Sequence, residues 1–415
     1  MKTYELVGLN NDVNLQSINY PLYVYIELTD SCNFNCKFCS INNKNKNFIS
    51  VDLAKTILNQ LRDNNIYDVY YTGGEPLLHP NLKEIVEYAD KLGMRQTILT
   101  NGYLLNKYAD IFDKFLCICV SLHGSEKMHN VLTGNNNYNK LLMNISMAKK
   151  YTNVKINCTV ISDNQDIKEL KNVLDYANAN DLEVSFSKYN NLGIGKKNNC
   201  SIDIEKFVKT LDDLKKNYRF GINDCIATCL LEDRYEYLSH GCGAGYLFAS
   251  VSYSGDVKIC PSSTNILGNI KNTSFDKIWN QKELKNYRKF NWIPTYCKSC
   301  KYLSKCRCGC KVELNDKITE FNDYNVARKK DQMWDKIKNK KMKVNISLIR
   351  FEKGKFINLS TPPRKFNKET LKVIELLNEG TKPINLVEDM DLILSLYRDK
   401  LIEEEKNAKK KVKRR

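Results

Sequence analysis

The sequence has no run of about 18 or more apolar residues, the length at which a helix can cross a membrane, so we expect no membrane-spanning segment. Residues 1–19 contain no apolar core of signal-peptide length, and we therefore expect a cytoplasmic protein. Histidine is scarce, with 4 residues, whereas the chain contains 16 cysteines, many of them clustered. In a cytoplasmic chain this combination favours metal clusters over disulfides.

The formal net charge is +17, and seven of the basic residues lie in the last ten positions, 406–415. A terminal basic run is typical of a solvated tail, so we assign residues 405–415 to one. The remaining positive charge can attract nucleic acid or an acidic peptide, and charge alone does not choose between them. Residues 1–20 are polar and weakly patterned, which predicts an N-terminal arm.

Three cysteines, Cys32, Cys36 and Cys39, follow an apolar run with the spacing C-x3-C-x2-C. Three thiolates from one short loop can hold three irons of a cubane [4Fe–4S] cluster and leave the fourth iron without a protein ligand. Such an open iron can bind a small molecule directly. A structural zinc site is the alternative, but it needs four nitrogen or sulfur ligands, and no histidine lies nearby in the sequence.

Two further features accompany this loop: Phe38 precedes the last cysteine, and Gly73-Gly74-Glu75-Pro76 follows downstream. Together these features resemble the radical S-adenosylmethionine (radical SAM) enzymes. The resemblance implies that the amino and carboxylate groups of SAM chelate the open iron of the cluster. One electron from the cluster then cleaves SAM to a 5′-deoxyadenosyl radical, with a protein such as flavodoxin or ferredoxin as the reductant.

Strand and helix signals alternate from Tyr20 to about Leu214. Amphipathic stripes predict helices between the strands, the first with Ser50 as its N-cap, and a helix near 204–214 closes the set. This alternation predicts an α/β fold with a parallel sheet and helices outside. The resemblance makes residues 21–220 a partial (β/α)6 TIM-like barrel, whose chemistry lies at the carboxyl ends of the strands. Apolar runs predict these strands at 22–28, 68–71, 97–99, 115–120, 154–161 and 183–186.

Glycine and polar residues come directly after several predicted strands, where ligands bind in such a barrel. Gly73 and Gly74 lack a Cβ, so their backbone can approach a ligand closely, and Glu75 offers an acceptor for an ammonium group. By the resemblance, this stretch contacts the SAM amino group. Asn101 and Ser121 match positions that bind the SAM ribose or carboxylate, and a turn or cap role fits either residue equally well.

The remaining histidines and cysteines of the predicted barrel need no chemical role. Three of the four histidines are expected to be packed loop residues without a catalytic role: His79, His123 and His129. Three cysteines on predicted strands are expected to behave as small buried apolar residues: Cys117, Cys119 and Cys158.

From Gly221 the alternation ends and a second group of cysteines begins, with Cys242 and Cys260 flanking Gly255 at the spacing C-x12-G-x4-C. The group resembles the SPASM extension of radical SAM enzymes. Two further segments match the same pattern, Gly255-Asp256 and Leu267-Gly268-Asn269-Ile270. We therefore assign residues 221–314 to a SPASM domain, in which the segment 274–279 predicts a short helix. A later run reads C-x2-C-x5-C-x3-C with one extra cysteine inside it: Cys297, Cys300, Cys306, Cys308 and Cys310.

The SPASM resemblance implies one or two auxiliary [4Fe–4S] clusters. The first takes Cys242, Cys260 and Cys310, with its last ligand from Cys229 or Cys225. The usual last ligand of the second lies after Cys310, where this chain has no cysteine, so either Cys308 substitutes or that iron is open or otherwise ligated. A zinc ribbon built from the later run is the alternative, but it leaves the C-x12-G-x4-C pair unexplained. The second cluster takes three ligands from the later run: Cys297, Cys300 and Cys306.

After a Lys-rich linker at 315–343, residues 344–404 predict a small α+β domain. Two strands, at 344–351 and 356–359, flank a Lys353-Gly354 turn, which is a hairpin signal, and two amphipathic helices follow. This winged-helix-like pattern resembles the PqqD-like domains of peptide-modifying systems, which bind a leader peptide as an added strand. A generic cap that only packs on the barrel fits the same pattern.

The predicted function is that of a radical SAM/SPASM enzyme that forms a thioether or carbon–carbon crosslink in a ribosomally synthesised precursor peptide. One alternative is an anaerobic sulfatase maturase, in which an Asp follows the cysteine that corresponds to Cys260, whereas Pro261 follows here. Another is a nucleic-acid-binding iron–sulfur protein, which interleaved aromatic and basic stretches would favour. No such stretch stands out, so nucleic acid is not an expected partner. A membrane is not expected either, because the sequence has no long apolar run. The sequence names no catalytic acid or base.

Overall fold

The computed structural model describes residues 19–41, 45–223, 225–228, 231, 233–239, 241–289, 306–313, 334–345, 349–352, 355–358, 364–366, 368–398 and 401–405. The chain forms two compact units, which are described separately. The first unit comprises residues 19–292 and 308–318, and the second comprises 1–18, 293–307 and 319–415. The predicted arm, basic tail and linker lie largely outside the described residues.

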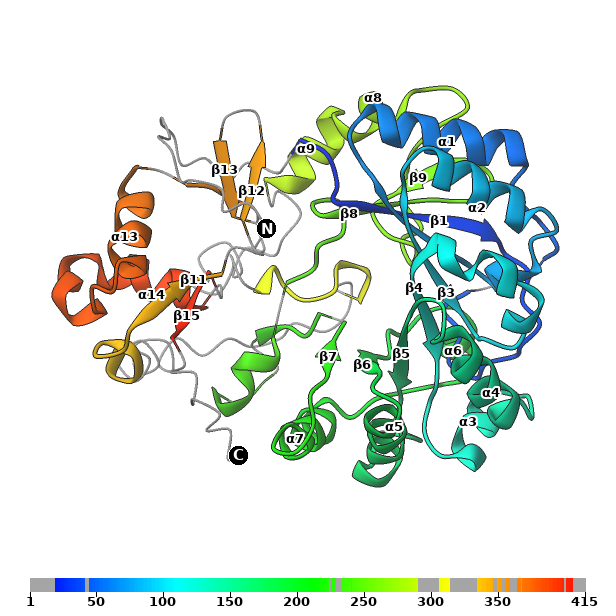
Figure 1. Ribbon diagram of the computed structural model, residues 1–415, viewed down its shortest axis with the longest axis horizontal. Helices are drawn as coiled ribbons and strands as arrows, with labels where there is room; N and C mark the ends of the chain where they lie inside the picture. The colour runs from blue at the N-terminus through cyan, green and yellow to red at the C-terminus, as the bar shows by residue number, and fades with distance from the viewer. Residues whose placement is uncertain are drawn as a thin grey trace, which may run out of the picture. The chain divides into compact units, whose positions relative to one another are not determined.

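The first unit is built on one sheet in which β1 to β6 lie side by side in chain order, each parallel to the next (Figure 1). This confirms the predicted parallel α/β fold and all six predicted strands. The six strands are β1 (Tyr23–Thr29), β2 (Asp68–Gly73), β3 (Arg95–Thr100), β4 (Phe115–Ser121), β5 (Asn153–Val160) and β6 (Glu183–Lys188).

Helices follow the strands and lie along the outer face of the curved sheet (Figure 1). The predicted cap is present, since the Ser50 side chain accepts a hydrogen bond from Leu53 N. The helices are α1 (Val51–Asp63), α2 (Leu82–Lys91), α3 (Glu126–Thr133), α4 (Tyr138–Ala148), α5 (Ile167–Ala179), α6 (Gly193–Lys197) and α7 (Ile204–Lys215). Short 3-10 turns lie between some of them, at η1 (Pro76–Leu78), η2 (Leu105–Lys107) and η3 (Ala109–Lys114).

The two faces of the sheet differ in composition, because side chains alternate along each strand. Val24 and Val69 are fully buried on the outer face, where Gln96 donates to the Val86 carbonyl of α2. The inner face carries an aromatic cluster near the start of the strands. Its rings lie 4.8–5.6 Å apart between centroids and belong to Tyr23, Tyr25, Tyr70 and Phe248.

Strands from the predicted SPASM segment extend the same sheet, which the sequence did not predict. β8 (Phe248–Val251) pairs in parallel with β1, and the antiparallel strands β9 (Asp256–Lys258) and β10 (Ile266–Asn269) continue from it. On the opposite edge β7 (Gly221–Ile222) joins β6, so ten strands form one sheet among the described residues. The predicted short helix is present as α8 (Phe275–Trp279), and three further elements complete the unit: α9 (Lys282–Arg288), η5 (Asp233–Leu238) and η6 (Lys311–Glu313).

The second unit contains two small sheets and two main helices. The predicted hairpin is present, since β12 (Ile349–Glu352) and β13 (Lys355–Asn358) pair antiparallel, and β14 (Arg364–Lys365) adds a third strand. β11 (Met342–Val344) pairs with β15 (Ile402–Glu404), near the end of the chain. The predicted helices are α13 (Lys368–Asn378) and α14 (Met390–Arg398), with η8 (Pro383–Asp389) between them. The turn residues Lys353 and Gly354 lie outside the described residues.

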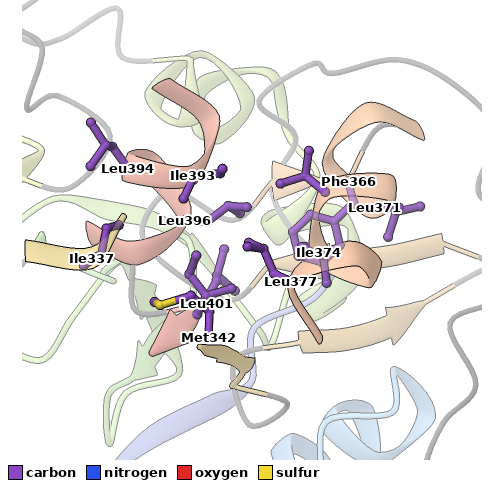
Figure 2. Packing of buried hydrophobic residues seen from close by; sticks show 12 residues of the cluster. Ile337, Met342, Phe366, Leu371, Ile374, Leu377, Ile393, Leu394, Leu396 and Leu401 are labelled. Atoms are coloured by element: carbon purple, nitrogen blue, oxygen red, sulfur yellow. The ribbon is translucent and has the colours of Figure 1, made fainter. Parts of the chain in front are cut away.

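A separate hydrophobic core holds the second unit together (Figure 2). Ile374, Leu377 and Ile393 are fully buried, and they come from α13 and α14. Met342 and Ile402 bring the β11–β15 pair onto the same core. The winged-helix and PqqD-like character of this unit stays a prediction.

Across the described residues, no helix is long and apolar enough to cross a membrane.

Candidate functional site

The loop with Cys32, Cys36 and Cys39 follows β1 at the carboxyl edge of the parallel sheet, as predicted. All three thiols are partly exposed and none forms a disulfide. The backbone of the loop is held by α3, because Lys37 N donates to the Leu132 carbonyl at 2.8 Å and Asn35 N donates to Thr133 O. These two hydrogen bonds tie the loop to the end of α3.

A second segment, which sequence reasoning missed, holds the same loop from the side of β6. Gly195 N donates to the Cys39 carbonyl at 2.9 Å. Gly193 has φ +56, and a Cβ there would lie 2.2 Å from Ser40 C, so only glycine fits this approach. The signal that points to this segment is the Gly193-Ile194-Gly195 sequence shortly after a predicted strand.

Gly73 and Gly74 bring the end of β2 against the backbone that leads into the cysteine loop. A Cβ on Gly74 would lie 2.0 Å from Ser31 O, and one on Gly73 would lie 2.1 Å from Thr29 O. Gly74 N donates to Thr29 O at 2.8 Å. The close approach that these glycines allow is therefore, first of all, an approach to the protein's own loop.

Glu75 points into the protein and is 1% exposed. Its carboxylate accepts hydrogen bonds from Leu77 N, from the Thr100 hydroxyl at 2.7 Å and from Asn101 N at 2.8 Å. Burial raises the pKa of Glu75 to about 7, although these three donors oppose the shift. The carboxylate thereby ties the turn after β2 to the turn after β3. Pro76 follows it as the first residue of η1 and is buried.

The other predicted SAM-binding residues lie at the same edge of the sheet. The Asn101 side chain donates to Asn33 Oδ1 at 2.9 Å, which places it directly on the cysteine loop. Ser121 ends β4 and is partly exposed, opposite Asn157 of β5. The Phe38 ring meets the His123 ring edge-on, with 4.8 Å between centroids.

The three predicted packed histidines are buried and bonded to backbone groups. His79 Nε2 lies 2.7 Å from the Ile49 carbonyl, which makes that nitrogen the donor. His123 Nδ1 accepts from Thr159 N, and His129 Nδ1 accepts from His123 N. Burial is the main cause that lowers the pKa of all three rings. These contacts are those of residues that shape loops.

The cysteine loop has the donor types of an iron–sulfur site with three protein ligands, although no three His, Cys, Asp or Glu side chains among the described residues are gathered around one metal position. Its donors are three thiols from eight consecutive residues, and Phe34 N donates to Cys32 Sγ at 3.4 Å. A backbone N–H directed at sulfur favours the thiolate that a metal needs. The donor set alone therefore suits three irons of a cubane cluster.

The three cysteines expected to be apolar have high thiol pKa values. Cys158 is fully buried and Cys117 is 7% exposed, while Cys119 is partly buried. Burial raises the pKa of all three thiols, that of Cys119 to about 12. Their burial within the sheet is that of small apolar side chains, in agreement with the expectation.

A second group of thiols gathers on the other side of β1. Cys260 follows β9, and burial together with the nearby Cys242 thiol raises its pKa to about 11. Burial lowers the pKa of Lys311, next to Cys310, and the nearby Cys242 and Cys260 thiols oppose this. Cys242 and Cys260 therefore lie near each other, and Lys311, which follows Cys310 in the sequence, lies near both. The ligand set of the first auxiliary cluster stays a prediction.

The same neighbourhood contains the segment that starts at Cys225. Gly309 has φ +73, and a Cβ there would lie 2.9 Å from Ala227 N, so the two segments are in close contact. Cys225 is partly buried, whereas Cys229 lies outside the described residues, so the choice between them as a ligand stays open.

The predicted ligands of the second auxiliary cluster are described only in part. Cys297 and Cys300 lie outside the described residues. Cys306 is 7% exposed, and Cys308 is 5% exposed with φ +66. The ligand set of this cluster stays a prediction.

Comparison with known families identifies both cysteine groups. Residues 26–177 match the model of the radical SAM superfamily, and residues 242–301 match that of the SPASM iron–sulfur cluster-binding domain. A PqqA peptide cyclase of Bradyrhizobium diazoefficiens is 23% identical over 321 residues, which is 71% of this chain and 83% of the relative. An uncharacterised protein of Methanocaldococcus jannaschii is 30% identical over 237 residues, 53% of this chain and 78% of the relative.

Two solved structures share the fold. SuiB of Streptococcus suis, bound to the precursor peptide SuiA, superposes with a TM-score of 0.60 at 20% identity and covers 71% of this chain and 73% of its own. The protein anSMEcpe with bound AdoMet superposes with a TM-score of 0.54 at 19% identity, over 74% of this chain and 95% of its own. At these identities the superpositions support the fold alone, which is the predicted one. The chain belongs to the radical SAM superfamily and carries a SPASM domain, so it is an enzyme whose cofactors are SAM and iron–sulfur clusters.

Proposed function

We propose that this enzyme modifies a ribosomally synthesised precursor peptide, by forming a thioether or carbon–carbon crosslink within it. The observation that carries the proposal is the similarity to PqqA peptide cyclases, which extends over 71% of this chain and 83% of the relative. The shared fold with SuiB, which was solved with its precursor peptide, agrees with it. Cys32, Cys36 and Cys39 would hold the [4Fe–4S] cluster, which would supply the electron for reductive cleavage of SAM and so provide the radical that takes a hydrogen atom from the peptide.

The contribution of this chain's own residues is positioning. Phe38 and the turn after β3 flank the cysteine loop, and the Glu75 carboxylate fixes that turn by accepting from Asn101 N. Gly73 and Gly74 let the β2 end sit against the loop, which keeps the SAM-binding edge compact. We infer that a small electron-donor protein, flavodoxin or ferredoxin, supplies the electron in the cytoplasm, where thiolate ligands stay reduced.

The second unit supports a role in recognising the peptide. Its sheet of β12, β13 and β14 has edge strands among the described residues, and an extended leader peptide can add to such an edge. A hairpin followed by two helices is also the pattern expected of a PqqD-like domain. We propose that residues 344–404 bind the leader of the substrate.

Co-expression with candidate peptides tests the function. Mass spectrometry of a peptide encoded beside this gene is expected to show a mass lower by two hydrogens, with fragmentation blocked between the joined residues. The Cys36→Ala variant is expected to leave the peptide unchanged. An unchanged peptide with the intact enzyme, under conditions that yield 5′-deoxyadenosine, would count against peptide crosslinking. A change confined to one residue, with unblocked fragmentation, would instead favour the sulfatase-maturase type of oxidation.

A further inference from the structure

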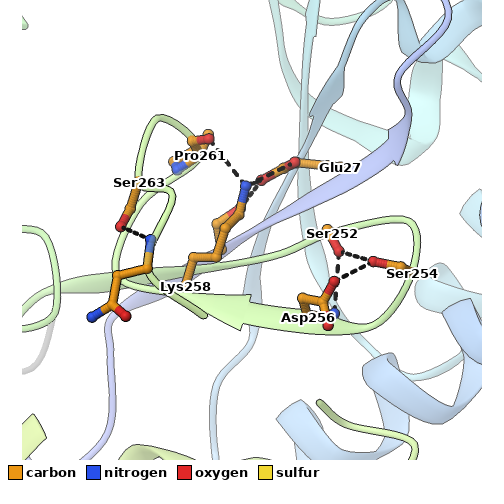
Figure 3. A network of polar contacts seen from close by, with 9 residues as sticks. Glu27, Ser252, Ser254, Asp256, Lys258, Pro261 and Ser263 are labelled. Atoms are coloured by element: carbon orange, nitrogen blue, oxygen red, sulfur yellow. Dashed lines mark hydrogen bonds and ion pairs between the residues drawn. The ribbon is translucent and has the colours of Figure 1, made fainter. Parts of the chain in front are cut away.

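Glu27 and Lys258 form an ion pair that spans three strands of the sheet (Figure 3). Glu27 lies on β1 and Lys258 ends β9, with β8 between them. The Lys258 ammonium lies 2.8 Å from Glu27 Oε1 and 3.2 Å from Oε2. The two side chains are only 13% and 15% exposed, so this pair is largely withdrawn from water.

The pair is completed by partners from β8 and from the loop after β9. The Ser250 hydroxyl donates to Glu27 Oε1 at 2.5 Å, and Ser250 stands opposite Lys258 in the ladder. Lys258 Nζ also donates to the Pro261 carbonyl at 3.1 Å (Figure 3). Withdrawing an ion pair from water gains little stability compared with apolar packing, so its specific geometry needs another explanation.

The position of the pair gives that explanation. Lys258 precedes Cys260 by two residues, and its ammonium holds the carbonyl of the residue that follows Cys260. The lysine therefore fixes the backbone on both sides of this thiol. Glu27 in turn fixes the lysine, and β1 runs from Glu27 towards the loop that starts at Cys32. The pair thus joins the strands that lead into the two iron–sulfur sites.

The charge of Lys258 also reaches the thiol. Its ammonium donates to the carbonyl of Pro261, the residue directly after Cys260, so the cation lies close to this thiol. An iron–sulfur cluster gains one negative charge on reduction, so a nearby cation favours its reduced form. Glu27 offsets that cation in part, because it is the ammonium's direct partner.

We propose that Glu27 and Lys258 are a positioning pair for the SPASM iron–sulfur site at Cys260, with Lys258 holding the Cys260–Pro261 segment and favouring the reduced cluster. Lys258→Met is then expected to make the cluster harder to reduce, because the cation is lost while the side-chain length is kept. Glu27→Gln is expected to make it easier to reduce, because the ammonium is no longer offset. The double variant is expected to lie close to the wild type.

The test is a redox titration followed by electron paramagnetic resonance on anaerobically reconstituted full-length protein. All variants carry alanine at Cys32, Cys36 and Cys39 and at Cys297, Cys300 and Cys306, so neither the SAM-cleaving cluster nor the second auxiliary cluster contributes a signal. We expect shifts of opposite sign in the two single variants, each near a tenfold change in the reduction equilibrium, or about 59 mV for one electron. Lys277→Met, an exposed lysine on α8 of the same unit, is the matched control and is expected to show no shift.

The measured reduction potentials decide whether the proposal stands. Potentials equal to the wild type in both single variants, or shifts of the same sign, would overturn the proposal. If the Lys258→Met protein does not assemble the cluster at Cys260, the Lys258→Arg variant is measured instead. Cluster assembly in the arginine variant supports the positioning role, and loss of the cluster in both variants contradicts it. Because the measurement involves no peptide, its result is independent of the proposed crosslinking function.

Discussion

The side-chain amide of Asn101 donates a hydrogen bond to Asn33 Oδ1 at 2.9 Å, inside the loop that carries the three cysteines. The backbone N–H of Asn101 donates at the same time to Glu75 Oε2 at 2.8 Å. One residue after β3 therefore connects the Gly-Gly-Glu-Pro turn to the cysteine loop. This bridge adds to the direct contacts of Gly73 and Gly74 with the loop, which already join two motifs about forty residues apart in the sequence.

Replacing Asn101 should weaken SAM use without removing the cluster. In Asn101→Ala the hydrogen bond to the loop is lost, and we expect formation of 5′-deoxyadenosine to fall about tenfold at subsaturating SAM, near 1.4 kcal/mol. Iron content should stay at the wild-type level. Asn139→Ala, an exposed change on α4, is the control. Equal 5′-deoxyadenosine formation in both variants would refute the bridging role of Asn101.

Replacing Gly74 should damage the cysteine loop itself. A Cβ in Gly74→Ala would lie 2.0 Å from Ser31 O, which is backbone and cannot yield as a flexible side chain would. We expect loss of about four irons per chain, those of the SAM-cleaving cluster. Gly93→Ala is a matched control, since its φ of +73 costs stability but no atom lies within 4 Å of the new methyl. Full iron loading in Gly74→Ala would show that the loop can move away.

The sequence predicted the parallel sheet well because its signals are local. Apolar strands, the Ser50 cap and amphipathic helices each depend on neighbours within one or two turns, and all were confirmed. The pairing of β8 with β1 joins residues more than 220 positions apart, and no local pattern encodes it. The sequence also could not predict that the Glu75 side chain points into the protein, because its hydrogen-bond donors on Thr100 and Asn101 are brought close only by the fold.

Glu75 should make the stability of the cofactor-free protein fall as the pH rises. Its folded pKa is about 7 against an ordinary value of 4.5, so the folded state keeps a proton that the unfolded state releases. The unfolding free energy should lose up to about 3 kcal/mol from this group between pH 4.5 and pH 7. The measurement is urea unfolding of wild type and Glu75→Gln across that range.

The quantity to follow is the difference in unfolding free energy between wild type and Glu75→Gln, because three histidines change the stability with pH in the opposite direction. Burial lowers the pKa of His79, His123 and His129, so their contribution to stability rises over the same range. Subtracting the variant curve from the wild-type curve removes them. We expect that difference to decrease towards pH 7, and a difference that does not change with pH would show that Glu75 titrates normally.

The second unit should depend on its own core. Ile374 is fully buried on α13, so Ile374→Ala should lower the stability of this unit by about 2–4 kcal/mol. Hydrogen exchange of the full chain should then become faster in α13 and in the β11–β15 pair, while β1 to β6 keep their protection. Lys372→Ala, an exposed change on the same helix, should leave exchange unaltered. Faster exchange throughout both units would contradict a separate core.

The amount of iron bound per reconstituted chain should reveal the number of clusters. With three [4Fe–4S] clusters the reconstituted chain should hold about twelve irons, and with two about eight. We expect about twelve in the wild type and about eight after joint replacement of Cys297, Cys300 and Cys306 by alanine. A wild type with about eight irons and one zinc would instead assign those cysteines to a zinc ribbon.

The Cys308→Ser variant tests whether Cys308 is the fourth ligand of the second auxiliary cluster, because the sequence has no cysteine after Cys310. A drop towards eight irons assigns that place to Cys308, and unchanged iron leaves it to another ligand or an open iron.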